Sequence, residues 1–126
     1  MTNTLTVLRT DIVSRLTAAG LNAYGYVPAA IEAPLFLVLA GSPYVVAPTE
    51  DNTFCSGDTD ALINYDILVF ASAMDNETAV DELEQLVSDA IHALSGYGFV
   101  QVSKPGKMGD TPTLGCIISI SHVDSL

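Results

Sequence analysis

The amphipathic segment at residues 75–96 constrains the fold most, because it predicts a helix that needs another layer to cover one of its faces. Its sequence, DNETAVDELEQLVSDAIHALSG, gathers apolar residues on one side and charged or polar residues on the other. Asp75 or Asn76 is suited to cap its first turn, and Gly96 to end it in a left-handed conformation. The predicted apolar stripe consists of Val80, Leu83, Val87, Ala90, Ile91 and Leu94.

The rest of the chain predicts one more helix and a set of strands. Residues 4–19 repeat apolar side chains at helical spacing, and Gly20 follows as a stop signal. A turn is predicted at Gly41-Ser42-Pro43, directly after a buried strand. Strands are predicted at residues 23–27, 35–40, 61–73, 97–103 and 114–123. We therefore expect an α/β (α+β) fold in which residues 1–126 form a single domain. Two helices would pack on a mixed sheet of about four to five strands, in the order α-β-β-β-α-β-β.

The long predicted strand at residues 61–73 has two faces of different character. One face is apolar throughout, whereas the other begins polar at Asn64 and Asp66 and becomes apolar at Leu68 and Phe70. If the central helix covers the first face, something else has to cover Leu68 and Phe70. The first helix and another subunit are equally good candidates.

The charge of the chain excludes some classes of function. Fifteen acidic residues against four basic ones give a net charge of −11. Gripping DNA or RNA requires clustered Lys and Arg, so we expect no specific nucleic-acid binding. An acidic surface that DNA passes without adhering is compatible with this charge, and so is solubility alone. The longest apolar run, residues 35–40, is too short to cross a bilayer, so no membrane partner is expected.

The pattern of reactive residues indicates no enzyme, cofactor or metal site. His92 falls on the polar side of the central helix, and His122 lies near the C-terminus. Cys55 and Cys116 have neither metal-type spacing nor a histidine close in sequence, although a thiol within reach of a histidine would revive an enzymatic alternative. The carboxylates of residues 48–59 lack the regular alternation of a calcium loop, and no phosphate-binding glycine motif is present.

Two connecting segments stand out by length and composition. Residues 48–59, PTEDNTFCSGDT, form the longest polar segment, and loops of this length are usually functional or mobile. Residues 104–112 carry both lysines of the chain together with Pro and Gly, and predict a long hairpin tip. A solvated tip and a finger that reaches an acidic neighbour explain this segment equally well.

The order of elements resembles that of a known family across essentially the whole chain. The helix LRTDIVSRLTAAGL leads into AYGYVP, and PLFLVLAGSPYV follows a second proline. After an acidic loop come the strand INYDILVFASAMDN, a helix that ends in LSG, and a glycine-rich hairpin. This pattern resembles the tail terminator, or tail completion, proteins among the minor tail proteins of siphophages.

The resemblance implies a structural virion protein of the tail neck that is assembled in the host cytoplasm. It would form a hexameric ring that caps the tail tube, stops its polymerisation and docks the head-side connector or head-closure protein, while DNA passes through the lumen. The residues implied in contacts by analogy are Glu50, Asp51, Phe54 and Asp58 in the acidic loop, and Lys104, Lys107 and Met108 in the hairpin tip. Leu68 and Phe70 are candidates for the subunit seam. Another neck protein is the alternative, followed by a monomeric ligand-binding domain.

Overall fold

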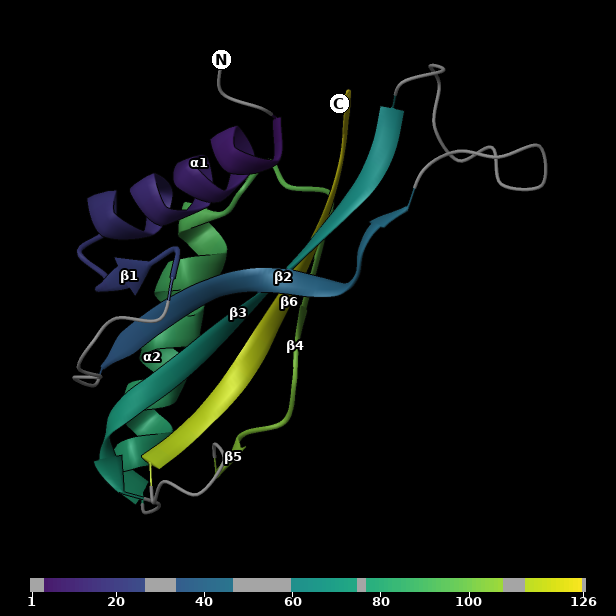
Figure 1. Cartoon of the computed structure of the whole chain (residues 1–126). Helices are drawn as coiled ribbons and strands as arrows, with labels where there is room; N and C mark the ends of the chain where they lie inside the picture. Colours follow the sequence, from purple (N-terminus) through teal and green to yellow (C-terminus); the bar gives the residue numbers. More distant parts are fainter. Residues whose placement is uncertain (1–3, 27–33, 47–59, 75–76, 108–112, 126) are drawn as a thin grey trace.

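The computed structural model describes residues 4–26, 34–46, 60–74, 77–107 and 113–125. In these ranges two helices pack on one side of a mixed sheet, which confirms the expected α+β fold (Figure 1). The helices are α1 (Thr4–Ala18) and α2 (Glu77–Ala93). The strands are β1 (Ala23–Tyr24), β2 (Leu35–Val46), β3 (Asp60–Met74), β4 (Phe99–Val102), β5 (Gly106–Lys107) and β6 (Thr113–Ser125).

The sheet is built around the long antiparallel pair of β3 and β6. The strand order is β1-β2-β3-β6-β4, with the two-residue β5 also paired to β6. β1 runs parallel to β2, and the other pairs are antiparallel. This order places β1 and β4 at opposite edges of the sheet.

The hydrophobic core lies between the two helices and one face of the sheet. The alternate residues Ile63, Tyr65, Ile67, Val69 and Ala71 of β3 are buried, as their period of two predicts. Leu8, Ile12 and Leu16 of α1 belong to the same core as Leu83 and Leu94, so α1 packs on the same face as α2. Of the two candidates for covering Leu68 and Phe70, the first helix is therefore excluded, and another subunit stays a prediction. Their register opposite Leu37 and Leu35 places them on the other face.

The predicted turn at Gly41-Ser42-Pro43 is also wrong, because β2 continues through it to Val46. The register with β3 shifts between Ala40 and Val45, which marks a bulge. Asn64 Nδ2 donates a hydrogen bond of 2.8 Å to the Pro43 carbonyl, and a Cβ placed on Gly41 would lie 2.8 Å from Asn64 Cβ. Glycine thus permits a close approach of the two strands, and the Asn64 amide provides a contact where the regular ladder is interrupted.

The apolar stripe of α2 is only partly buried. Ala79, Leu83, Ala90 and Leu94 are inaccessible, but Val80 and Val87 are half-buried and Ile91 is 40% exposed. The helix packs over β3 and β6, and part of its apolar side, including Ile91, is not covered by the sheet. The prediction that Ile91 belongs to the buried stripe is therefore wrong for this chain in isolation.

The ends of the helices follow the predicted signals where the structure describes them. Gly20 and Gly96 have φ values of +86° and +102°, the left-handed region that glycine adopts without strain. Asp75 and Asn76, the predicted caps of α2, lie outside the described residues. His122, near the C-terminus, pairs with Ile63 within the β3–β6 ladder.

Candidate interaction surfaces

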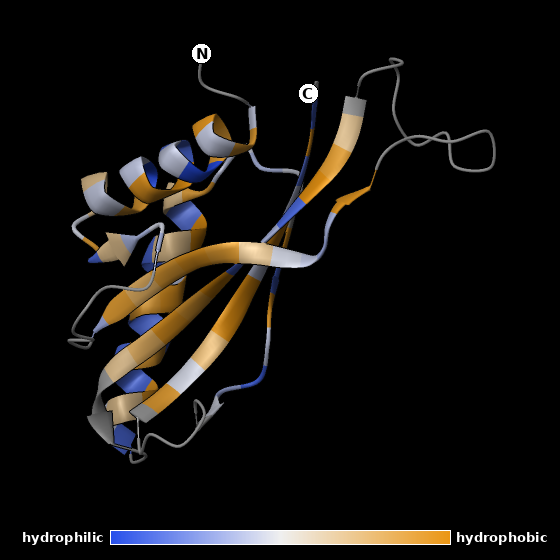
Figure 2. Ribbon diagram, viewed as in Figure 1, coloured by the Kyte–Doolittle hydropathy of each residue, from blue (hydrophilic) through white to orange (hydrophobic). Residues whose placement is uncertain are grey.

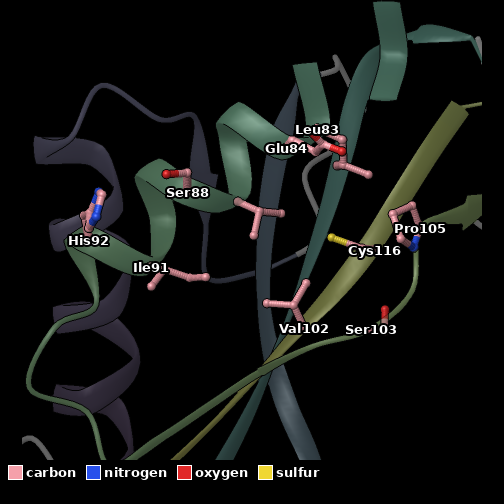
Figure 3. A pocket seen from close by; sticks show the side chains of 10 residues that line it. Leu83, Glu84, Ser88, Ile91, His92, Val102, Ser103, Pro105 and Cys116 are labelled. Atoms are coloured by element: carbon pink, nitrogen blue, oxygen red, sulfur yellow. The ribbon is translucent and has the colours of Figure 1, made fainter. Parts of the chain in front are cut away.

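A groove of about 460 Å³ runs between α2 and the β4 edge of the sheet (Figure 3). Its walls are mostly apolar, and the polar side chains lie toward the rim, as Ser88 and His92 do in Figure 3. The groove exists because the apolar side of α2 is wider than the part of it that β6 and the short strand β4 cover. Its lining residues are Leu83, Glu84, Val87, Ser88, Ile91 and His92 from α2, and Val102, Ser103, Pro105 and Cys116 from the sheet side.

Residues that line this groove are unusually exposed for their type. Ile91 and Val102 face solvent from opposite walls, and each is 40% exposed. Glu84 is exposed and makes no ion pair with a residue that the structure describes. The groove is therefore an apolar surface with a free carboxylate on its helical wall, a composition typical of sites that bind another molecule.

A second surface lies at the opposite edge of the sheet, where α1 packs beside β1. Tyr26 is 70% exposed there, more than the other exposed large hydrophobic side chains of the described ranges. Arg9 runs along Gly25, since a Cβ on that glycine would lie 3.4 Å from Arg9 Cδ. The ring of Tyr24 supports Tyr26 in an edge-to-face contact, with 6.3 Å between ring centroids. Arg9, Thr10, Val13, Ser14, Gly25 and Tyr26 line a shallow hollow, and we call this set the Arg9–Tyr26 patch.

A third surface is the sheet face that the helices leave uncovered, here called the open face. Leu68, Phe70 and Ile117 are half-buried on it, next to the buried Leu35 and Leu37 of β2. Hydrophobic residues predominate along much of β2 and β3 and continue into β6 (Figure 2).

A polar row crosses the middle of the open face. Ser119 Oγ donates a hydrogen bond of 3.0 Å to Asp66 Oδ1, and Ser121 Oγ donates one of 2.6 Å to Asn64 Oδ1. Because these polar groups bond to one another across β3 and β6, they are neighbours in a ladder and do not surround a cavity.

The strongest cluster of titratable groups joins α1 to the loop after α2. Asp11 accepts hydrogen bonds from the Tyr97 hydroxyl (2.5 Å) and from Arg15 Nε (2.8 Å). These two contacts lower the pKa of the Asp11 carboxyl, whereas burial and the same carboxylate raise the pKa of Tyr97. Arg15 Nη1 also donates to the Ser95 carbonyl at 2.8 Å, and its guanidinium lies over the Tyr97 ring. The cluster therefore connects α1 to the loop after α2. We call Asp11, Arg15 and Tyr97 the clasp.

The thiol and histidine that line the groove do not form a reactive pair. Burial raises the pKa of the Cys116 thiol to about 11, so the thiol stays protonated near neutral pH. Figure 3 shows His92 at the other end of the groove from Cys116, with its ring directed away from the sulfur. Across the described ranges no group of three or more His, Cys, Asp or Glu residues is arranged to hold a metal ion. Cys55 lies outside these ranges.

The structure describes some of the predicted contact residues and not others. Glu50, Asp51, Phe54, Asp58 and Met108 lie outside the described residues. Lys104 is exposed between β4 and β5, and the backbone of Lys107 pairs with Leu114, so part of the predicted hairpin tip is a strand. Leu68 and Phe70 lie on the open face, as described above.

Sequence reasoning missed the groove and the Arg9–Tyr26 patch. One signal was present in the sequence: the stripe of α2 is broad enough to exceed a single line of contact with a sheet. Tyr26 gave no comparable signal, because its exposure depends on how β1 pairs with β2.

The described part of the chain has a small α+β fold with two helices on one face of a mixed sheet. No model of a known protein family matches the chain, and no curated protein matches it. None of the helices in the described part has the length and apolar character needed to span a bilayer.

Proposed function

We propose that this chain is a tail terminator of a siphophage: a structural, non-enzymatic virion protein that forms a ring on the tail tube. The ring stops tube polymerisation and provides the surface on which the head-side connector or head-closure protein docks. The sequence resemblance supports this proposal through element order and length. The family resembled forms hexamers, so six subunits are the expected stoichiometry.

The observation that carries the proposal is the distribution of uncovered apolar surface. The groove, the Arg9–Tyr26 patch and the open face lie on three different sides of one small domain. A monomer gains nothing from leaving such surfaces exposed, whereas a subunit with neighbours on several sides uses them as interfaces. In the described ranges, by contrast, the polar pairs of the open face and the Tyr97–Asp11 pair bond to one another and do not converge on a closed cavity.

The charge of the chain fits this role. DNA that leaves the capsid has to pass the ring without being held, and a net charge of −11 repels phosphates. Specific binding of nucleic acid is therefore not part of the proposal.

The experiment that tests the proposal combines mass and imaging. Light scattering on the purified chain should give the mass of a closed oligomer, and electron microscopy should show rings. Added to polymerising tail-tube protein of the same phage, the chain should shorten the tubes and appear at one end. A chain that stays monomeric at high concentration and leaves tube length unchanged would overturn the proposal.

A different neck protein is the alternative within the same class. A head-closure or connector component would also form a ring, but it would bind the head-side assembly and leave tube growth unaffected. The tube-length measurement therefore separates the two functions.

A monomeric ligand-binding domain is the second candidate, because the groove has the volume of a small-molecule site. Its open shape and the placement of polar groups at the rim favour a protein partner instead. A small molecule that binds the monomer and raises its melting temperature would support this alternative.

A further inference from the structure

From the distribution of exposed apolar residues and unpaired charges, we infer that the subunit seam joins the two opposite edges of the sheet: the Arg9–Tyr26 patch of one copy docks into the α2–β4 groove of the next. The inference rests on the proposed ring function and names the surfaces that close the ring. It assigns the seam to different residues from Leu68 and Phe70, which lie on the open face.

The first support is the placement of exposed apolar side chains. The large hydrophobic residues that stand out by exposure in the described ranges are Val7, Tyr26, Ile91, Val102 and Val123. Ile91 and Val102 face each other across the groove, and Tyr26, at 70% exposed, stands at the other edge. A protruding aromatic ring and an apolar groove are complementary shapes, and buried tyrosines are frequent anchors of protein interfaces.

The second support is charge complementarity. Arg9 lies beside Gly25 within the patch, and Glu84 stands on the helical wall of the groove. Both side chains are exposed, and neither makes an ion pair with a described residue. Lys104 is also exposed near the groove, but it belongs to the segment after β4 and leaves the α2 wall acidic. Docking would therefore bring an unpaired cation to an unpaired carboxylate.

The third support is the distance between the two surfaces. β2, β3 and β6 separate β1 from β4 in the sheet, so the edges are about 19 Å apart at ~4.8 Å per strand. Tyr26 cannot reach the groove of its own chain across that distance, and the contact has to join two copies. A contact between two different surfaces is heterologous, and it generates a ring when the rotation from one copy to the next closes on itself.

The size of the groove matches the proposed occupant. Its volume of about 460 Å³ accommodates a tyrosine ring and part of the arginine stem, and a single aliphatic side chain would leave it mostly empty. The rim supplies partners for the tyrosine hydroxyl, because Ser88 and His92 line the helical wall.

A charge-swap experiment tests the inference. Oligomer mass is measured by light scattering for the wild type, Arg9→Glu, Glu84→Arg, the double variant and an equimolar mixture of the two single variants. Each single variant should weaken association about tenfold or more, since it places like charges together in every seam. The double variant and the mixture should both recover the ring, because each restores opposite charges at every seam.

Matched controls keep the experiment interpretable. Asp81→Arg reverses a charge on the exposed side of α2 outside the groove and should leave the mass unchanged. Tyr26→Ser should weaken association without altering the circular dichroism spectrum of the monomer, because its side chain is largely exposed.

The outcomes separate the inference from the proposed function. Rings that persist in both single variants, or a double variant that fails to recover, would overturn the seam while the ring itself stands. A wild-type chain that forms no oligomer, alone or with tail tube, would overturn the proposed function and the seam together.

Discussion

The hydroxyl of Tyr97 donates a 2.5 Å hydrogen bond to Asp11 Oδ2 and so ties the loop after α2 to the middle of α1. The two residues are 86 positions apart in the chain, and Arg15 completes the contact by bonding both Asp11 and the Ser95 carbonyl. Because α1 contacts the sheet mainly near β1 and β2, this clasp fixes its position relative to α2. It therefore also fixes where the Arg9–Tyr26 patch stands relative to the groove.

Tyr97→Phe should lower the free energy of unfolding by about 1 kcal/mol at neutral pH. The lost bond is to a carboxylate, but Asp11 is partly exposed, so solvent screening keeps the loss modest. Urea denaturation of the wild type and the variant measures it. An unchanged midpoint would show that the bond contributes nothing to stability.

The difference in the free energy of unfolding between wild type and Tyr97→Phe should decrease at low pH and at high pH. Because folding lowers the pKa of Asp11, its contribution is present above the unfolded value of about 4 and is lost as pH falls through the folded pKa. Because folding raises the pKa of Tyr97, that contribution is present below about pH 10 and is lost as pH rises through the folded pKa. The difference should therefore be largest between about pH 5 and 9, and a difference that grows toward pH 3 would contradict the clasp.

Gly41→Ala should destabilise the fold by about 1–3 kcal/mol, because its methyl group would lie within 2.9 Å of Asn64 atoms, backbone included. Thermal unfolding measures the loss. Gly106→Ala is the matched control, since nothing lies within 4 Å of its added Cβ. Equal melting temperatures of the two variants would show that the strands at the β2 bulge separate easily.

Much of the fold follows from the sequence because its patterns are local. The alternation in β3 predicts which side chains are buried, since one face of a strand in a two-layer fold meets the helices. Both helices are likewise evident from their spacing, and the left-handed stops at Gly20 and Gly96 from their residue type. These features depend on neighbours within a few positions of the chain.

The bulge and the groove depend on contacts between distant segments and were not predictable in the same way. Gly41 and Pro43 are typical turn residues, and the contact of Pro43 with Asn64, 21 positions away, keeps them in the strand. The exposure of Ile91 depends on how far β4 extends beside α2, a distance that residue spacing does not encode. Five of the nine contact residues implied by the resemblance lie outside the described ranges, so their roles stay predictions.

Cys116 should react slowly with thiol reagents in the native protein. Its side chain is buried, and a pKa of about 11 leaves little thiolate at pH 8. In a Cys55→Ser background, where Cys116 is the remaining thiol, the reaction rate with iodoacetamide should rise strongly in urea. A native rate close to the denatured one would show that the reagent reaches Cys116 in the folded protein and would revive a role for this thiol.

The two faces of β3 should respond differently to truncation. Ile67 is inaccessible, so Ile67→Ala should cost about 2–5 kcal/mol through lost packing and a cavity. Leu68 is half-buried on the open face, and Leu68→Ala should cost about 1 kcal/mol in the monomer. Urea titrations of both variants measure the difference. Equal losses would mean that the open face is covered in the isolated chain.

The open face should contact the neighbouring assembly along the tail axis, because the seam inferred above uses the sheet edges and leaves this face free. Leu68→Ser and Phe70→Ser should then keep the oligomer mass but lose the ability to limit tail-tube length, as measured by electron microscopy of tubes grown with each variant. Val123→Ser, at the other end of the same face opposite Leu62, is the matched control and should cap tubes normally. Loss of the ring itself in Leu68→Ser would place the seam on the open face, as the sequence resemblance had implied, and would contradict the edge-to-edge arrangement.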